Sequence, residues 1–154
     1  MPDIAPQRRA RRIAMSAAER DTFLHLQRTV RVASIGPDGA PHVTPLWFVW
    51  DGEHMWLNSL TRSQRWANLA RNPRVAVVVD AGDGYAELHG VELSGHVEPV
   101  GEQPRTGEPN PALDAVERLF SDKYFDGIPF AHDGRHAWLR ITPEREYTWD
   151  FRKL

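Results

Sequence analysis

Residues 55–79, MWLNSLTRSQRWANLARNPRVAVVV, predict a buried strand, a turn rich in hydroxyls and arginines, a short helix and a second strand. Asn72-Pro73 ends the helix, because proline restricts the residue before it and lacks a helical N–H. The start of a helix presents unpaired N–H groups and the positive end of the helix dipole. The turn therefore predicts a cradle for a phosphate or another anion. The alternative is a turn that only caps the helix.

Strand patterns flank this stretch on both sides. Before it, two alternating runs around Pro37-Asp38-Gly39 predict an antiparallel hairpin, and Asp51-Gly52 joins the hairpin to the next strand. After it, a long alternating run breaks at Gly90, which predicts a bulge or a sharp bend, and Pro143 separates two closing strands. The predicted strands cover residues 29–35, 42–50, 55–58, 74–80, 85–97, 137–142 and 147–151.

Two more short helices are predicted outside this stretch. Ser16 and Glu19 have capping-box spacing ahead of a helical pattern in residues 17–27. Asn110 precedes an apolar pattern with a period near that of a helix, formed by Leu113, Val116, Leu119 and Phe120. Because strands do not alternate regularly with helices, we expect a mostly β fold with short helices, an antiparallel barrel of six to seven strands.

The composition fits one globular domain. The chain has 154 residues, a formal net charge of -2 and no cysteine, which excludes disulfides, thiol catalysis and thiolate metal sites. Residues 1–14 are rich in arginine and proline, so we expect a mobile tail ahead of a domain that covers residues 15–154. Balanced charge and short apolar runs predict no nucleic-acid partner, no membrane association and a cytoplasmic location.

Few chemical motifs are present. The seven histidines form no tight metal-binding spacing, so no metal site is predicted, and GxSxG, GxGxxG and Walker patterns are absent. In the turn, hydroxyls could donate to a phosphate and guanidinium groups could make charge-assisted contacts. Thr61 and Gln64 also have capping-box spacing, so the helix itself could engage one hydroxyl. The candidate phosphate-binding residues are Ser59, Thr61, Arg62, Ser63 and Arg65.

Three tryptophans lie on the neighbouring predicted strands. Trp47, Trp50 and Trp56 could flank a planar ring, or they could belong to the core or to an interface. The residue pattern alone leaves these alternatives open.

The runs RVASIGPDGAPHVTPLWFVWDGEHMWLNS and RSQRWANLARNPRVAVVVD resemble the pyridoxamine 5'-phosphate oxidase-like split β-barrel superfamily, and within it the flavin and deazaflavin oxidoreductases. The resemblance implies a split antiparallel β-barrel and a homodimer with two cofactor sites at the interface. It also implies coenzyme F420, with FMN as the alternative. Ser59, Ser63 and Arg65 match phosphate-binding positions, with Thr61 and Arg62 in the same loop. The cofactor ring would lie along Val43, Thr44, Pro45 and Leu46.

The sequence departs from this family pattern in one turn. Many relatives carry lysine where this chain has Arg65 or Trp66, and arginine supplies the charge with another reach and geometry. A full set of C-terminal residues for a pyridoxamine phosphate substrate is not matched, so vitamin B6 synthesis is not predicted. Asn68 matches a helix position that we interpret as structural.

The leading prediction is an oxidoreductase that transfers a hydride between F420 and a small conjugated organic substrate. No catalytic proton donor is assigned, since the cofactor carries out such chemistry. The alternatives are an FMN-dependent reductase or oxidase of the same fold, and a non-enzymatic flavin-binding or haem-binding protein that uses His42 or His89.

Overall fold

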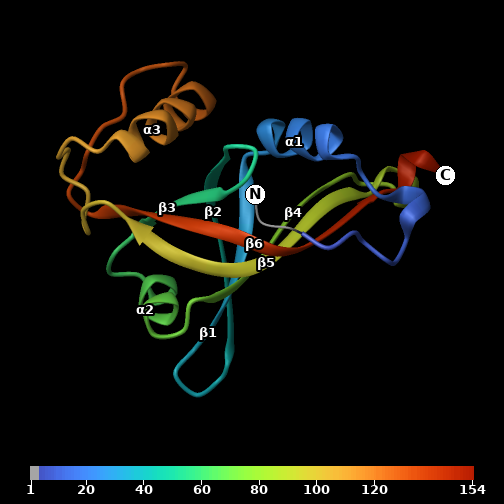
Figure 1. Ribbon diagram of the computed structural model, residues 1–154, viewed down its shortest axis with the longest axis horizontal. Coiled ribbons are helices and arrows are strands. Elements are labelled where there is room, and N and C mark those ends of the chain that lie inside the picture. Colours follow the sequence, from blue (N-terminus) through green and yellow to red (C-terminus); the bar gives the residue numbers. More distant parts are fainter. Residues whose placement is uncertain (1–3) are drawn as a thin grey trace.

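Six antiparallel strands close into a barrel in the order β1-β2-β3-β6-β5-β4 (Figure 1). The computed structural model describes residues 4–154. The strands are β1 (Thr29–Ile35), β2 (Pro41–Trp50), β3 (Met55–Leu60), β4 (Arg74–Ala81), β5 (His89–Val100) and β6 (His136–Asp150). The α-helices are α1 (Ala17–Leu26), α2 (Gln64–Arg71) and α3 (Pro111–Tyr124), with 3-10 turns η1 (Arg11–Ile13), η2 (Tyr85–Glu87) and η3 (Phe151–Lys153). The predicted mostly β barrel with short helices is confirmed.

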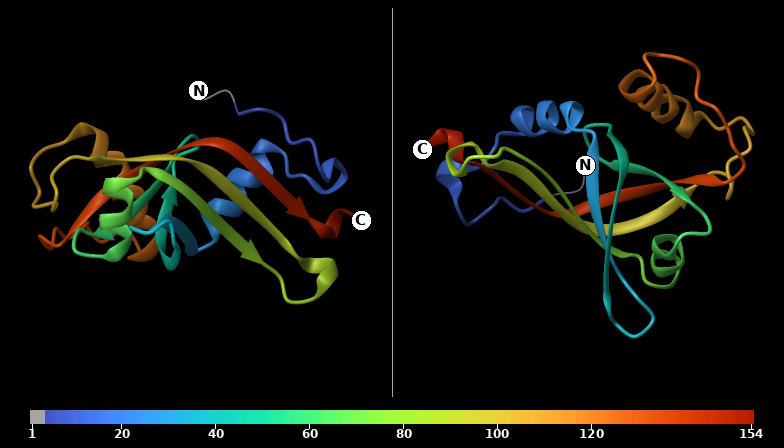
Figure 2. Two further views of the ribbon diagram at one scale, coloured as in Figure 1. Left: turned by 90° about the horizontal axis from the view of Figure 1, so that it is seen from below. Right: turned by 180° about the vertical axis from the view of Figure 1, so that it is seen from behind.

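The barrel is split because β2 soon leaves β3. The two strands pair only from Phe48 to Trp50, whereas residues 41–47 pair with β1 alone. α2 packs against β1 and β2 at this opening, at the same end of the molecule as α3 and away from the C-terminus (Figures 1 and 2). One edge of β2 therefore lacks a strand partner beside the N-terminal turn of α2.

Two helix caps form as the sequence predicts. Ser16 accepts a hydrogen bond from the Glu19 N–H, and the Glu19 carboxylate accepts one from the Ser16 N–H, which completes a capping box. The Asn110 side chain accepts from the Ala112 N–H at the start of α3. These local signals set where α1 and α3 begin.

The core has two parts. The barrel interior is filled by apolar side chains from all six strands, closed at its ends by Phe23 and Leu24 of α1 and by Leu69 of α2. The second part lies between α3 and the outer faces of β2, β3 and β6. It contains Val49, Trp56, Leu113, Val116, Phe120, Tyr124 and Trp138. α3 is thus fixed to the barrel by a satellite core of its own.

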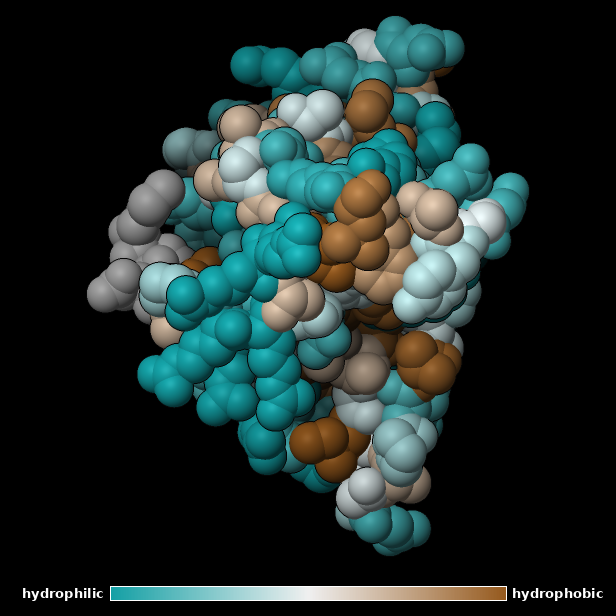
Figure 3. Space-filling model, turned by 90° about the vertical axis from the view of Figure 1, so that its right-hand side faces the viewer, coloured by the Kyte–Doolittle hydropathy of each residue, from teal (hydrophilic) through white to brown (hydrophobic). Residues whose placement is uncertain are grey.

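The N-terminal segment runs along β6. The Gln7 amide donates to the Thr148 carbonyl at 3.0 Å and accepts from the Thr148 N–H at 2.9 Å, and Ile13 is buried. Figure 3 shows this end of the molecule, where apolar side chains form small groups among hydrophilic ones. Residues 1–3 of the predicted tail lie outside the described residues. The domain boundary after residue 14 stays a prediction.

β6 is one continuous strand, so the prediction of two strands separated by Pro143 is wrong. Ser94 pairs with Arg145 and Gly95 with Pro143, which leaves Glu144 as the extra residue of a bulge. A proline fits beside a bulge because the interrupted ladder needs one donor less there. A Cβ at Gly95 would lie 2.1 Å from the Thr142 carbonyl oxygen, so the close approach of the strands requires glycine.

Of the bulge or sharp bend predicted at Gly90, the bulge does not form. Gly90 pairs in register with Asp80 on β4 and Trp149 on β6. A Cβ at Gly90 would lie 2.5 Å from Cζ2 of Trp149 and 2.8 Å from the Val79 carbonyl oxygen. The missing side chain leaves room for the indole, which explains why the alternation breaks without an extra residue.

Gly90→Ala should therefore lower the free energy of unfolding by about 1 to 3 kcal/mol, because neither the indole nor the neighbouring backbone can yield freely. Urea unfolding would measure the loss. Gly84→Ala is the matched control, since its nearest contact would be Oε2 of Glu87 at 3.6 Å. Equal stability of the two variants would contradict the packing argument.

A buried ion pair anchors the loop before α3. Glu117 on α3 accepts from Nε and Nη2 of Arg105, both at 3.0 Å, from Nε1 of Trp138 at 3.0 Å, and from Nε2 of His132 at 3.1 Å. Burial raises the pKa of Glu117, but these hydrogen bonds outweigh it and hold the pKa below its ordinary value of 4.5. The carboxylate is fully paired, so it joins β6, α3 and two loops.

Glu117→Gln should destabilise the fold by about 2 to 4 kcal/mol at pH 7, because it removes the carboxylate that accepts from Nε and Nη2 of the buried guanidinium and leaves Glu102 as the remaining anionic partner. Because folding lowers the pKa, this contribution is present above pH 4.5 and is lost as the pH falls through the folded-state pKa. Wild type and variant should therefore converge in thermal unfolding below pH 4.5. Glu108→Gln, in the same loop but exposed, should show no such convergence.

Candidate functional site

Arg65 is the centre of the candidate site. It lies in the first turn of α2, and its side chain is directed between β2 and β3 and is buried. Nε and Nη2 donate to Oγ of Ser59 at 3.2 and 3.1 Å, and Nη1 donates to Oγ1 of Thr44 at 2.7 Å. The fold thus brings together three predicted residues from β2, β3 and α2.

The guanidinium has no anionic partner. Arg65 forms no ion pair with any residue from 4 to 154, and two neutral hydroxyls are its hydrogen-bond partners. Burial alone lowers its pKa, because desolvation disfavours the charged form. An arginine stays protonated even so. A buried, desolvated cation beside hydroxyl groups is a site that an anion would complete.

The other residues of the turn bond to the chain itself. Ser63 is the N-cap of α2: its Oγ accepts from the Trp66 N–H at 3.1 Å and donates to the Leu60 carbonyl at 2.9 Å. Thr61 donates to the Arg135 carbonyl through its N–H at 3.0 Å and through Oγ1 at 3.3 Å. The Thr61–Gln64 capping box does not form, because Thr61 bonds to a loop carbonyl outside the helix. The prediction that the helix engages one hydroxyl of the turn is confirmed, and that hydroxyl belongs to Ser63.

Arg62 lies on the exposed side of the same turn. Its side chain makes no hydrogen bond to the described part of the chain. Phosphate binding by Thr61, Arg62 and Ser63 stays a prediction. To bind a phosphate, Thr61 and Ser63 would each have to use a hydroxyl that already bonds to the backbone.

The unpaired edge of β2 carries the residues predicted to face a cofactor ring. Val43 is 65% exposed and Pro45 is exposed, while Thr44 and Leu46 point toward the interior and are partly covered. Successive side chains of a strand alternate between its faces. The edge itself therefore offers backbone groups to a ligand, and the Thr44 side chain offers a hydroxyl to Arg65.

His42 is a residue whose place in this site the sequence reasoning missed. It lies two residues before Thr44, so both side chains are on the same face of β2. Its Nδ1 is buried and has no hydrogen-bond partner within residues 4–154. The sequence suggests His42 only as an alternative haem ligand, and its period-two spacing from Thr44 is the signal that indicates a shared face.

The three tryptophans separate into two roles. Trp50 and Trp56 belong to the core, and their Nε1 atoms donate to carboxylates of Asp21 and Asp51, both at 2.8 Å. Trp47 is 41% exposed and stacks on Tyr124, with ring centroids 4.3 Å apart and an interplanar angle of 7°. Of the three, Trp47 alone is available to contact a ligand or a partner.

The Tyr124 hydroxyl fixes this aromatic pair to β2. It accepts from the Phe48 N–H at 3.0 Å and lies 2.8 Å from the Phe48 carbonyl oxygen. Burial raises its pKa to about 12, so the phenol stays protonated. α3 thus contacts β2 one residue beyond the segment that pairs with β1 alone.

Two other functional signals are absent within the described residues. No group of three or more His, Cys, Asp or Glu side chains from residue 4 onward is placed to hold a metal ion. None of the helices there is both long and apolar enough to cross a membrane.

Comparison with known proteins shows matches over most of the chain. A family model described as pyridoxamine 5'-phosphate oxidase matches residues 16–150. A crystal structure of a conserved hypothetical protein from Mycobacterium tuberculosis is 36% identical, with a TM-score of 0.79, and the match covers 96% of this chain and 92% of the other. A structure described as an F420 reductase is 28% identical, with a TM-score of 0.62, covering 82% and 94%.

A curated relative matches a shorter stretch. It is a 5a,11a-dehydrotetracycline/5a,11a-dehydrooxytetracycline reductase from Streptomyces rimosus, 38% identical over 63 residues. This match covers 38% of the chain and 44% of the relative, which is less than half of the length of either protein.

Arg65→Met should leave the ligand-free protein as stable as wild type, or more stable by about 1 kcal/mol, because it removes a desolvated cation that no carboxylate compensates. Inorganic phosphate should raise the melting temperature of wild type more than that of the variant. Arg118→Met, on the exposed side of α3, is the control and should keep the full response to phosphate. A loss of several kcal/mol in Arg65→Met would mean that the arginine is structural.

Proposed function

The chain belongs to the pyridoxamine 5'-phosphate oxidase family, and from this premise we propose that it is an oxidoreductase that transfers a hydride between coenzyme F420 and a small conjugated organic substrate. The observation that carries the proposal is the buried guanidinium of Arg65, held by Ser59 and Thr44 with no anionic partner among residues 4–154. It lies beside the unpaired edge of β2. A ligand with a phosphate and a flat ring matches these two features.

The residues present fit such a cofactor. Arg65 and Ser59 would hold the phosphate, with Thr61, Arg62 and Ser63 in the same turn, and the backbone of residues 43–46 would contact the ring. When bound, a reduced deazaflavin supplies a hydride to a conjugated substrate, which also takes up a proton. The chain's own task is to orient the ring and exclude water. We assign no side chain as proton donor.

The F420 assignment draws support from the relatives. One similar structure is described as an F420 reductase, and a curated relative reduces a dehydrotetracycline, a conjugated organic molecule. FMN is the alternative cofactor, because it carries the same kind of phosphate and a ring of similar shape. Arginine at position 65 provides the positive charge for either phosphate.

We also propose a homodimer with the cofactor sites at its interface. Val43 and Trp47 expose large apolar side chains on β2, at 65% and 41% of their surface. An apolar strand face next to a cofactor edge would be covered if a second copy packed against it. Such packing would exclude water from the ring.

Fluorescence titration with F420 and with FMN, side by side, tests the assignment. We expect saturable binding of F420, and Arg65→Ala should weaken it by about tenfold to a hundredfold, the equivalent of about 1.5 to 3 kcal/mol for a charge-assisted contact. Arg65→Lys should retain most of the affinity, and Arg118→Ala all of it. Oxidation of the reduced cofactor by an α,β-unsaturated ketone would demonstrate turnover.

Two results of the titration would contradict this assignment. Binding of FMN without F420 would replace the cofactor, and an unchanged affinity in Arg65→Ala would remove the arginine from the site. Binding of either cofactor without any turnover would favour a non-enzymatic binding protein.

A further inference from the structure

A pocket between α1 and α3 contains a lysine that the proposed function does not use. It lies where the C-terminal turns of both helices approach β2, and Leu26, Leu119 and Lys123 are among the residues that line it. Its volume is about 300 Å³, at the lower end of the range of about 300 to 1,000 Å³ for small-molecule sites. The pocket therefore fits a small organic molecule.

The Lys123 side chain is partly buried and has no carboxylate partner. Its Nζ donates to the Leu24 carbonyl at 3.0 Å and lies 3.9 Å from the centroid of the Phe48 ring. The carbonyl belongs to the last turn of α1, where the helix itself offers no donor. Both partners attract an ammonium, but neither carries a negative charge. Nζ forms no ion pair with any residue from 4 to 154, so two neutral groups replace its water.

These surroundings favour a neutral amine. Burial, together with the nearby charge of Arg28, lowers the pKa of Lys123 from 10.5 to about 8. Roughly half of the Lys123 side chains are then unprotonated at pH 8. A neutral amine can donate one N–H to the Leu24 carbonyl and still present its lone pair to an electrophile. Desolvated lysines of this kind form Schiff bases with carbonyl compounds.

Arg28 supplies a second cationic group to the same pocket. Its Cζ lies 5.0 Å from the centroid of the Tyr124 ring, and Nη1 donates to the Lys123 carbonyl at 3.5 Å. Within the described part of the chain this guanidinium forms no ion pair. A guanidinium with its face on an aromatic ring keeps N–H groups at its edge for a carboxylate. The pocket thus offers an amine to a carbonyl group and a guanidinium to a carboxylate.

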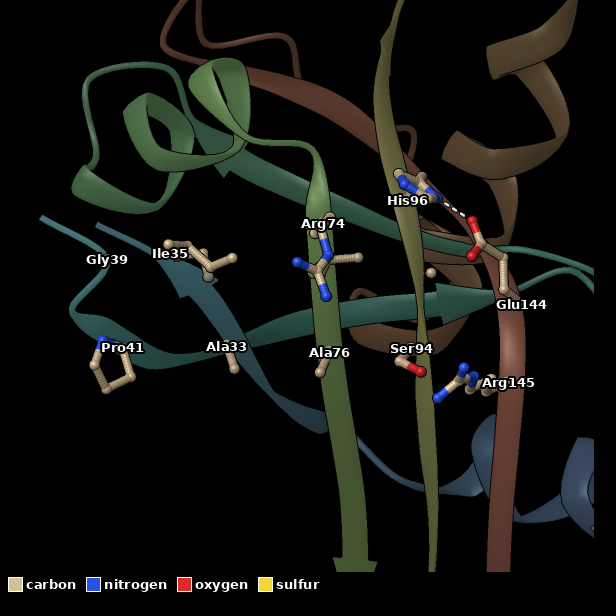
Figure 4. Close-up of a pocket in the computed structure, with 13 residues that line it drawn as sticks. Ala33, Ile35, Gly39, Pro41, Arg74, Ala76, Ser94, His96, Glu144 and Arg145 are labelled. Atoms are coloured by element: carbon tan, nitrogen blue, oxygen red, sulfur yellow. Dashed lines mark hydrogen bonds and ion pairs between the residues drawn. The ribbon is translucent and has the colours of Figure 1, made fainter. Parts of the chain in front are cut away.

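The pocket is separate from the face that the proposed homodimer would cover. Val43 pairs with Ala33, and Ala33 with Ala76, so the groove in Figure 4 belongs to the same outer face as Val43. Lys123 instead contacts Phe48, whose side chain belongs to the barrel interior. In Figure 1, α1 and α3 lie on the side of the barrel away from the hairpin of β1 and β2. A second copy on the outer face would therefore leave this pocket open.

We propose that Lys123 condenses reversibly with a small oxo acid, an aldehyde that also carries a carboxylate. The amine nitrogen adds to the carbonyl carbon, and its proton passes to the carbonyl oxygen to give a carbinolamine. Loss of water then forms the C=N bond, so one amine and one aldehyde yield one imine and one water. Arg28 binds the carboxylate, and His25 and Asp122, which also line the pocket, can carry the proton. The proposal goes beyond the proposed function, because it requires neither F420 nor FMN.

Trapping the imine identifies the amine that reacts, because Lys123 and Lys153 are the two lysines of the chain. The full-length protein is treated with an aldehyde and cyanoborohydride, and peptide mass spectrometry follows each lysine separately from the N-terminal amine. Lys153 is the internal control, since its Nζ is paired with Glu19 at 2.6 Å and donates to the Ala14 carbonyl at 3.0 Å. We expect alkylation of Lys123 to be at least about tenfold faster at pH 8, and to saturate with aldehyde concentration. Its rate should rise with pH, with a midpoint near pH 8.

Two aldehydes of equal chain length, 4-oxobutanoate and butanal, test the role of the carboxylate. The concentration that half-saturates alkylation of Lys123 should be at least about fivefold lower for 4-oxobutanoate, and salt should reduce this advantage. Arg28→Gln should remove most of the advantage, while alkylation by butanal persists. Arg118→Gln removes the same charge from the exposed side of α3 and should change nothing.

Three results would overturn the proposal. The first is alkylation of Lys123 no faster than that of Lys153, which would leave Lys123 as a cap of α1. The second is a rate that increases linearly with aldehyde concentration and never saturates. The third is the same half-saturating concentration for 4-oxobutanoate and butanal. Circular dichroism of the wild type and of each variant under the labelling conditions confirms that the reacting protein is folded.

Discussion

The pairing of β6 with two neighbours holds this barrel together. β6 pairs with β3 from His136 to Ile141 and with β5 from Trp138 to Asp150, so it closes the barrel on the side opposite β1. Because this ladder secures β3, that strand does not need a long pairing with β2. β2 can then diverge after three residue pairs and expose the edge beside α2. The edge of β2 at the candidate site can therefore stay open because β6 closes the barrel through its pairing with β3 and β5.

Two buried arginines show how differently this fold treats a charge. Arg105 is bonded to Glu117 and Glu102, and these hydrogen bonds raise its pKa. Arg65 contacts hydroxyls only, and burial lowers its pKa. A fold that can satisfy one guanidinium completely leaves the other without a carboxylate. Arg105 thereby fixes the loop before α3, whereas the ligand that we propose at Arg65 would supply the anion that the described residues do not.

Local sequence signals predicted most helices and strands, whereas the continuity of β6 and the contacts of the candidate site depend on pairing between distant parts of the chain. The Ser16–Glu19 box, the hairpin around Gly39 and the short helix before Asn72-Pro73 depend on neighbouring residues, so the chain shows them directly. The continuity of β6 through Pro143 depends on a bulge opposite Gly95, 48 residues earlier in the chain. The resemblance placed Arg65 and Ser59 at a phosphate site. The contact of Arg65 with the Thr44 hydroxyl, and the lack of a hydrogen-bond partner for Nδ1 of His42 within residues 4–154, could be seen only in the folded structure.

Alternation along β1 also separates two chemical environments within three residues. The Ser34 side chain is buried against α2, where it accepts from Nδ2 of Asn68, and Ala33 and Ile35 are partly exposed on the outer face of the sheet. A shift of β1 by one residue would place Ser34 on the outer face and an alanine beside Asn68, which would leave a buried amide unpaired. The Asn68–Ser34 hydrogen bond therefore disfavours that slip. Since α2 carries both Asn68 and Arg65, the same contact fixes the helix that holds the guanidinium at the open edge of β2 and keeps Ala33 and Ile35 on the outer face of the sheet.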